Sequence, residues 1–148
     1  MRIRKATQRD LETLVCLYTA FFKEDGITTS VPTIRANLST MLDDPRAIIW
    51  VVEVDRVVVG LASSTLTTGV EFGTIAELED LYVIPSARGQ GLSRKLIYNV
   101  SEWAEGNGAS LLHLVITPEA ESNQMLTAYY EKLGFHQLPR LAMVRHIQ

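Results

Sequence analysis

LEDLYVIPSARGQGLS, residues 78–93, decides how this chain folds. Its first half completes a strand predicted over residues 75–84, which closes at Pro85 because proline cannot continue a β-ladder. Its second half passes two glycines and enters an amphipathic helix predicted over residues 89–105. A strand that runs through a glycine turn into a helix points several backbone N–H groups outward, where the helix dipole is positive. The stretch therefore predicts a phosphate-binding turn.

Strands and helices are predicted on both sides of this turn. The strands cover residues 3–7, 47–54, 57–67, 75–84 and 111–117, with one or two closing strands after Phe135. The helices run from Asp10 to Gly26, from Pro32 to Asp43, over 89–105, and from a cap at Ser122 or Asn123 to Gly134. Strand, helix and strand recur from residue 75 to 117, which favours a parallel or mixed sheet. No repeat or linker interrupts the chain, so residues 1–148 are predicted to form a single α/β domain.

Composition excludes several classes of protein. The 148 residues are 47% hydrophobic and 21% charged, which is typical of a globular domain, and the net charge of −3 gives no attraction to nucleic acid. The apolar stretches are far shorter than the roughly 20 residues that span a bilayer, and no secretory segment follows Met1. A cytoplasmic protein is expected. Cys16 alone forms no internal disulfide, and the three histidines are too scattered to predict a metal site.

Two common phosphate loops do not fit the turn. A dinucleotide-binding fingerprint needs glycine or alanine three places after Gly91, where this chain has Arg94. A nucleotide-hydrolase loop needs a lysine after its last glycine, where this chain has Leu92. The glycines instead let an anion approach the backbone, and Arg88 adds a guanidinium suited to phosphate oxygens.

Arg88-Gly89-Gln90-Gly91-Leu92-Ser93 resembles the acyl-CoA loop of the GNAT superfamily of N-acetyltransferases, with Ser93 in place of the last small residue. Residues 123–135 are similar to a second signature of that superfamily, in which Asn123 stands seven residues before Tyr130, and three residues separate Tyr130 from Gly134-Phe135. Both motifs occur in the family's order, and the resemblance covers nearly the whole chain.

This resemblance implies a fold and an activity. The fold is an α/β domain, α+β in some schemes, with a mixed sheet of about six or seven strands, about four helices and two splayed strands that form an acyl-CoA cleft. The activity is acetyl transfer from acetyl-CoA, as cosubstrate, to a primary amine of a small molecule or peptide, without a metal. The alternative is a non-catalytic acyl-CoA-binding regulatory module on the same fold. Homodimers are common in the family.

The resemblance also implies which residues bind the coenzyme. Main-chain amides of the turn would hold the pyrophosphate, and main-chain groups of the preceding strand would pair with the pantetheine arm, with the N–H of Leu81 polarising the thioester carbonyl. Asn123 would cap a helix and contact the coenzyme arm. The expected coenzyme-binding residues are Leu81, Tyr82, Val83, Arg88, Gly89, Gln90, Gly91, Leu92, Ser93, Arg94, Asn123 and Tyr130.

Tyr130 occupies the family position of the general acid, since a phenol with a pKa near 10 can protonate a thiolate and stay neutral at physiological pH. Without the motif, Tyr129 and Tyr130 would be interpreted as packing residues of an amphipathic helix. For the base, strand alternation places Glu77 and Glu79 on one face and Asp80 on the other. Glu79 is the preferred base and Glu77 the second, either acting directly or through water; a solvated acidic strand edge is the alternative.

The acceptor amine is expected near residues 21–44 and 138–145, the segments with which family members shape this site. Four acidic residues in the first of these segments would attract a cationic amine, namely Glu24, Asp25, Asp43 and Asp44.

Overall fold

The computed structural model describes residues 1–122 and 124–148, so the predicted roles of Asn123 lie outside the described residues. The chain divides into two compact units, Met1–Val115 and Ile116–Gln148. Among the described residues, no helix combines the length and the apolar character that crossing a membrane requires.

The first unit is built on a five-stranded mixed sheet in the order β1-β2-β3-β4-β5. Its strands are β1 (Arg2–Lys5), β2 (Ala47–Val54), β3 (Val57–Gly69), β4 (Gly73–Val83) and β5 (Leu112–His113). Neighbours pair antiparallel except β4 and β5, which are parallel. The predicted mixed sheet is confirmed, whereas the closing strands predicted after Phe135 are wrong, because residues 135–148 hold no strand in the described structure.

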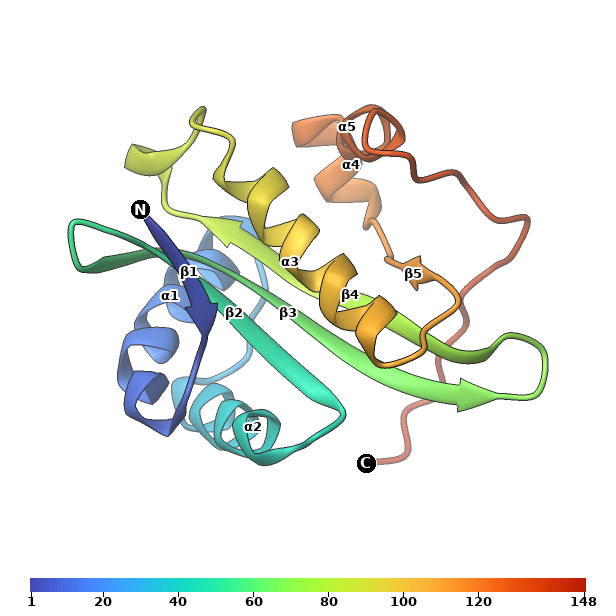
Figure 1. The fold of residues 1–148 in the computed structure, drawn as a ribbon, viewed down its shortest axis with the longest axis horizontal. Helices are drawn as coiled ribbons and strands as arrows, with labels where there is room; N and C mark the ends of the chain where they lie inside the picture. Colours follow the sequence, from blue (N-terminus) through green and yellow to red (C-terminus); the bar gives the residue numbers. More distant parts are fainter. The chain divides into compact units, whose positions relative to one another are not determined.

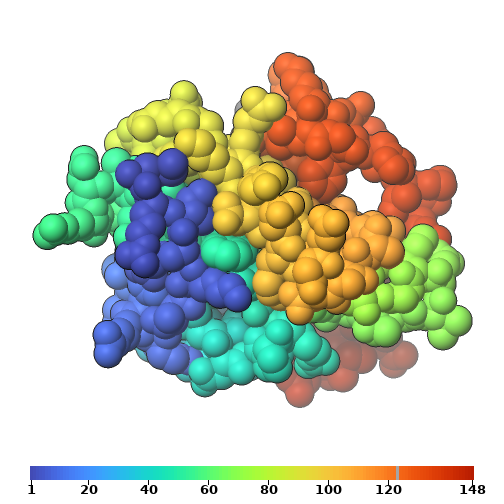
Figure 2. Space-filling model, in the orientation of Figure 1, coloured from blue at the N-terminus to red at the C-terminus, as the bar shows by residue number. Residues whose placement is uncertain are grey.

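Helices cover both faces of this sheet (Figure 1). Helices α1 (Leu11–Asp25) and α2 (Val31–Asp43) lie on one face, and α3 (Leu92–Gly106) lies on the other. In the space-filling view from the same side, the atoms of α3 cover part of the sheet (Figure 2). A buried cluster joins α1 and α2 to the sheet; its members are Leu14, Val15, Leu17, Tyr18, Ile34, Leu38, Ile49, Val51, Leu61 and Tyr82. The resulting layers leave β4 between α1 and α3.

Local signals set the helix ends. Gly26 ends α1 in the left-handed region (φ 71°), and the side chain of Ser30 caps α2, which carries proline in its first turn. Helix α3 begins at Leu92 and not at residue 89 as predicted. The reason is that Gly89 and Gly91 both have positive φ, which a right-handed helix cannot include.

The second unit contains two short helices, α4 (Pro118–Gln124) and α5 (Leu126–Glu131). The side chain of Thr117 caps α4, so the cap predicted at Ser122 is wrong. Met125 adopts φ 49° and separates the two helices. One continuous helix was therefore the wrong prediction, since a left-handed residue interrupts the helical hydrogen bonds.

Candidate active site

An extra residue in β4 sets the geometry of the central sheet. In the pairing of β3 with β4, Ser64 lies opposite Leu78, while its neighbour Ser63 lies opposite Asp80. Glu79 is therefore a β-bulge, an additional residue with no counterpart on β3. Because side chains alternate between the faces of a strand, one inserted residue moves everything beyond it to the opposite face.

The bulge gathers the acidic side chains of β4 on one face. Glu77 lies opposite Thr65, whose hydroxyl donates to Oε1 of Glu79 at 2.6 Å. Ser63, two residues away on the same face of β3, donates to Oδ2 of Asp80 at 2.8 Å. The prediction that Asp80 points to the opposite face is wrong, because the bulge turns it to the side of Glu77 and Glu79.

Asp80 is held from both the sheet and α1. The hydroxyl of Tyr18 donates to Oδ2 of Asp80 at 2.8 Å, and the fully buried Ser63 donates to the same oxygen. Burial raises the pKa of Asp80, and the hydrogen bonds from Tyr18 and Ser63 oppose that rise. Neither hydroxyl was singled out in the sequence. Together they fix this carboxyl beneath α1.

Glu77 is a carboxyl whose pKa is raised close to neutral pH. Burial, followed by the negative charges of Glu79 and Asp80, raises the pKa of Glu77 to about 7. Its Oε1 lies 3.8 Å from Nδ1 of His113 on β5. A carboxyl that titrates near neutral pH can exchange a proton with an amine under physiological conditions.

Strands β4 and β5 pair over a short distance only. Their ladder consists of Ala76 opposite Leu112 and Glu77 opposite His113. The strand predicted over residues 111–117 is limited to those two residues of β5. Beyond Glu77, β4 continues to Val83 while β5 has ended, and among the residues that the structure describes no strand pairs with this edge of β4.

Main-chain polar groups face the open edge of β4. Ile84 donates its N–H to the carbonyl of Val59 on β3. Because N–H groups alternate in direction along a strand, the N–H of Tyr82 also faces β3, and those of Leu81 and Val83 face the open edge. The Tyr82 side chain itself packs in the core, stacked on Phe21 with ring centroids 5.1 Å apart.

The glycine turn follows the open edge directly. A single 3-10 turn, Pro85–Ala87, leads to Gly89 and Gly91, with φ of 78° and 74°. A Cβ on either glycine would meet nothing within 4 Å, so the space before α3 is open. The first N–H groups of any helix have no acceptor within that helix, and those of α3 begin at this open space. The Leu92 side chain is buried, so only its main chain can take part.

The side chain of Arg88 is bound away from this space. Its Nε donates to the carbonyl of Val83 at 2.8 Å, and its Nη2 lies 2.8 and 2.9 Å from the carboxylate oxygens of Glu24 in α1. This arrangement gives no support to the predicted phosphate contact of the Arg88 side chain. It also engages the carbonyl of Val83, and it neutralises the charge of Glu24 that was expected to attract an amine.

Tyr130 belongs to the second unit, where it lies in α5. Its ring is buried and makes edge contacts with Tyr129 and Phe135, at centroid distances of 5.2 and 5.4 Å. Burial, with a smaller effect of Tyr129, raises the pKa of Tyr130 to about 12. The phenol therefore carries its proton at physiological pH.

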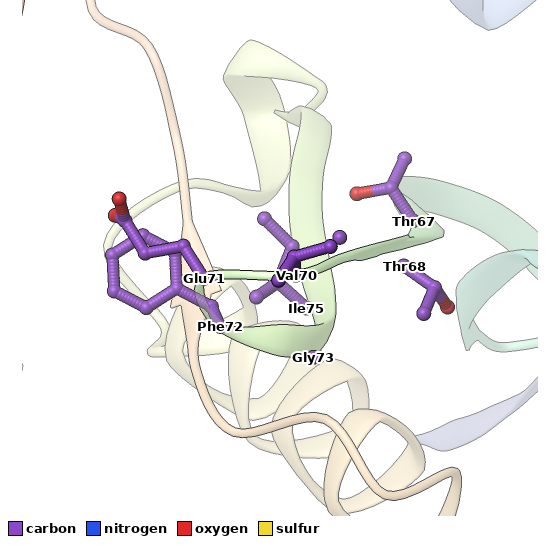
Figure 3. A pocket seen from close by; sticks show the side chains of 8 residues that line it. Thr67, Thr68, Val70, Glu71, Phe72, Gly73 and Ile75 are labelled. Carbon is purple, nitrogen blue, oxygen red and sulfur yellow. The ribbon is translucent and has the colours of Figure 1, made fainter.

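A shallow hollow of about 230 Å³ lies at the β3–β4 hairpin, lined by Thr67, Thr68, Gly69, Val70, Glu71, Phe72, Gly73 and Ile75 (Figure 3). Figure 1 shows this hairpin at the opposite end of β4 from the connection to α3. The hollow is therefore separate from the glycine turn and the open edge.

The open edge of β4 leads directly into the glycine turn at the start of α3. Residues 11–135 match the model of the acetyltransferase (GNAT) family. This chain belongs to that family. The match includes the carboxylate group of β4, the glycine turn and Tyr130, and it ends before residues 138–145, one of the two segments expected near the acceptor amine.

Curated relatives agree with this membership. The chain is 32% identical over 115 residues, 78% of its length, to the uncharacterized N-acetyltransferase YjgM of Escherichia coli. It is 26% identical over 62% of its length to aminoglycoside N(6′)-acetyltransferase type 1 of Salmonella typhimurium. The matches span 66% and 63% of these relatives' own lengths, so the activity of the whole protein is a matter for proposal.

A solved structure agrees with the fold. An aminoglycoside N-acetyltransferase in complex with CoA superposes with a TM-score of 0.84, over 99% of this chain and 95% of that one. The two sequences are 20% identical, so this likeness supports the GNAT fold and not a particular acceptor.

Proposed function

We propose that this chain is an acetyl-CoA-dependent N-acetyltransferase, with residues 1–148 acting as one domain on a primary amine of a small molecule or peptide. The observation that carries the proposal is the edge of β4, which is open between its short pairing with β5 and the glycine turn. An extended pantetheine arm can pair with such an edge, and a pyrophosphate can bind at the helix start that follows it.

In this proposal the backbone binds the coenzyme. N–H groups of residues 89–94 receive the pyrophosphate, since that of Arg88 donates to the carbonyl of Pro85. The N–H groups of Leu81 and Val83 face the pantetheine arm and the thioester. The Leu81 N–H polarises the thioester carbonyl and stabilises the oxyanion that forms on it. The carbonyl of Val83 remains with Arg88. Support comes from the open space at Gly89 and Gly91, which a side chain at either position would enter.

We assign the general base to Glu77, which reverses the order expected from the sequence and makes Glu79 second, with water as a relay for either. Amines of the lysine type have a pKa near 10.4, so an acceptor arrives as an ammonium ion and must lose a proton before it attacks. Glu77, whose pKa is raised to about 7, is better matched to that task than a carboxyl that ionises in acid. The neutral amine then attacks the thioester carbon directly in the ternary complex, the C–N bond forms and the C–S bond breaks. Tyr130 donates its proton to the departing thiolate, the nitrogen gives up its remaining extra proton to water as the amide forms, and Tyr130 regains a proton from solvent.

The pH dependence of the activity is expected to follow the ionisation of Glu77. Because the base works when ionised, kcat/KM should rise about tenfold per pH unit below pH 7 and level off above it. Glu77→Gln should remove this limb and lower kcat/KM at pH 8 by about 100-fold. Thiol release from acetyl-CoA, measured across a panel of amines, provides the profile. An unchanged profile in Glu77→Gln would exclude this residue as the base.

The same residue predicts a pH-dependent stability. The pKa of Glu77 is about 7 in the fold against 4.5 for a free side chain, so between these pH values the folded state keeps a proton that the unfolded state has lost. Stability due to this group therefore decreases as pH rises through that window. The difference in Tm between Glu77→Gln and the wild type should increase in favour of the variant as the pH rises from 4.5 to 7, and it should stay constant above pH 7. The exposed Glu102→Gln on α3 is the control, and an equal trend there would contradict the assignment.

The thiol-release measurement also distinguishes a catalytic protein from a non-catalytic acyl-CoA-binding module. Acetyl-CoA that binds the chain, with no thiol released by any amine class, would favour a non-catalytic acyl-CoA-binding module. Equal affinity for ATP and for coenzyme A would favour a general nucleotide-phosphate site. Acetylation of one amine class, with the product identified by mass, is the expected result.

A further inference from the structure

The ion pair of Arg88 with Glu24 joins segments that lie far apart in the sequence. Glu24 stands in the last turn of α1, next to the helix end at Gly26, and Arg88 is the residue immediately before Gly89. The guanidinium carbon of Arg88 also lies 5.6 Å from the ring centroid of Tyr82. Arg88 is thus held by a carboxylate, a carbonyl and an aromatic face, all within the first unit.

The carboxylate partner is itself well anchored. Phe21, one turn before Glu24 in α1, stacks on Tyr82 of β4. This contact fixes the end of α1 against the strand that leads into the glycine turn. Asp25 is the other acid beside the pair: burial and then the charge of Glu24 raise its pKa, and Arg88 lowers it. The positive charge of Arg88 therefore offsets the negative charges of Glu24 and Asp25, and the position of the Arg88 side chain depends on these two residues.

Gly89 and Gly91 themselves have no side chains that could anchor the turn that follows Arg88. Gly89 and Gly91 reach positive φ without strain, but glycine also leaves many other conformations open to the chain. Ordering such residues when a ligand binds opposes binding, and a turn already held in its bound form avoids part of that cost. Arg88 is the last anchored side chain before the turn.

We infer that Glu24 is a positioning residue for the coenzyme: by holding Arg88 against Val83, it keeps the glycine turn in the form that receives the phosphates. The inference rests on the proposed function. It assigns to the Arg88 side chain the role of a support under the turn, in place of a direct phosphate contact.

The test compares two ion pairs of α1. Glu24→Gln removes the partner of Arg88, and Glu12→Gln removes the partner of Arg35, which also forms two contacts of 2.8 and 2.9 Å but joins α1 to α2. For Glu24→Gln we expect Kd and KM for acetyl-CoA to rise about threefold to fivefold, with kcat within about twofold, as for a partly exposed pair. Glu12→Gln should leave all three constants unchanged. Equal constants in Glu24→Gln and wild type would overturn the inference.

A double-mutant cycle tests whether Glu24 acts through Arg88. In an Arg88→Gln background, Glu24→Gln should change Kd no further, and a rise equal to that in the wild type would contradict the inference. Added salt should also reduce the ratio of Kd between Glu24→Gln and wild type, because salt screens exposed pairs. A ratio that stays constant with salt would argue against an ion pair as the cause.

Hydrogen exchange in the free protein tests the inference without acetyl-CoA. Amides of residues 88–94 should exchange faster in Glu24→Gln than in wild type or Glu12→Gln, and equal exchange would overturn the support role. If the wild type failed to bind acetyl-CoA in calorimetry, the proposed function would fall and the coenzyme role of Glu24 with it. Normal wild-type binding with an unaltered Glu24→Gln would refute the inference alone.

Discussion

Tyr130→Phe is expected to lower kcat about 100-fold or more and to leave the Kd for acetyl-CoA within about twofold of the wild type. The substitution keeps the ring and its contacts with Tyr129 and Phe135, and removes only the phenolic proton. A thiolate that leaves without a proton donor is a poorer leaving group, so turnover falls while the ground-state complex is unchanged.

Tyr129→Phe is the matched control for this prediction. Tyr129 is the adjacent tyrosine of α5 and contacts the ring of Tyr130, so its replacement removes a hydroxyl from the same pair of rings. Its kcat should stay within about threefold of the wild type. If both variants lost turnover equally, packing would explain the loss, and an unaltered kcat in Tyr130→Phe would remove this residue from the acid role.

Gly91→Asp is expected to weaken acetyl-CoA binding by at least about 100-fold. Gly91 has φ 74°, and a Cβ there would extend into open space before α3. Aspartate and asparagine tolerate this backbone region better than other side chains, so the fold should survive either change. A carboxylate placed about 4 Å from a phosphate, at an effective dielectric constant near 20, is repelled by about 4 kcal/mol.

Two controls isolate the charge. Gly91→Asn has nearly the same shape without the charge and should weaken binding by about tenfold at most. Gly108→Asp places the same residue at another glycine with φ 79° and nothing within 4 Å, at the far end of α3. Its affinity for acetyl-CoA should equal that of the wild type. Equal losses in Gly91→Asn and Gly91→Asp would assign the effect to shape, and wild-type affinity in both would exclude the turn from phosphate binding.

Much of the first unit could be predicted from local patterns. Alternating apolar residues, the glycine after α1 and the proline near the start of α2 act over a few residues, and the elements they predict are present. The second unit was harder to predict from the sequence. The left-handed residue between its two helices is Met125, and not a glycine or asparagine, which are the residues that usually mark this conformation. Residues 111–117 are apolar enough for a strand, but a ladder also needs a partner, and β4 pairs with two of them.

The chemistry of the site was less predictable than its location. The bulge at Glu79 arises from the pairing of β4 with β3, and the sequence of β4 alone does not reveal it. One signal for the support of Asp80 was present, namely the serine at position 63 that follows the apolar pair Leu61 and Ala62, because a buried hydroxyl needs an acceptor. The partner of Arg88 could not be predicted, since it stands 64 residues away.

The central claim is that main-chain amides at the start of α3 bind the diphosphate of acetyl-CoA. The most direct measurement is the change in each backbone amide resonance of the ¹⁵N-labelled protein as coenzyme A is added. We expect the largest shifts at residues 89–94, with further shifts at Leu81 and Val83 on the open edge of β4. Shifts centred on the β3–β4 hairpin around Thr67 and Ile75, or no shifts at saturating coenzyme A, would contradict the claim.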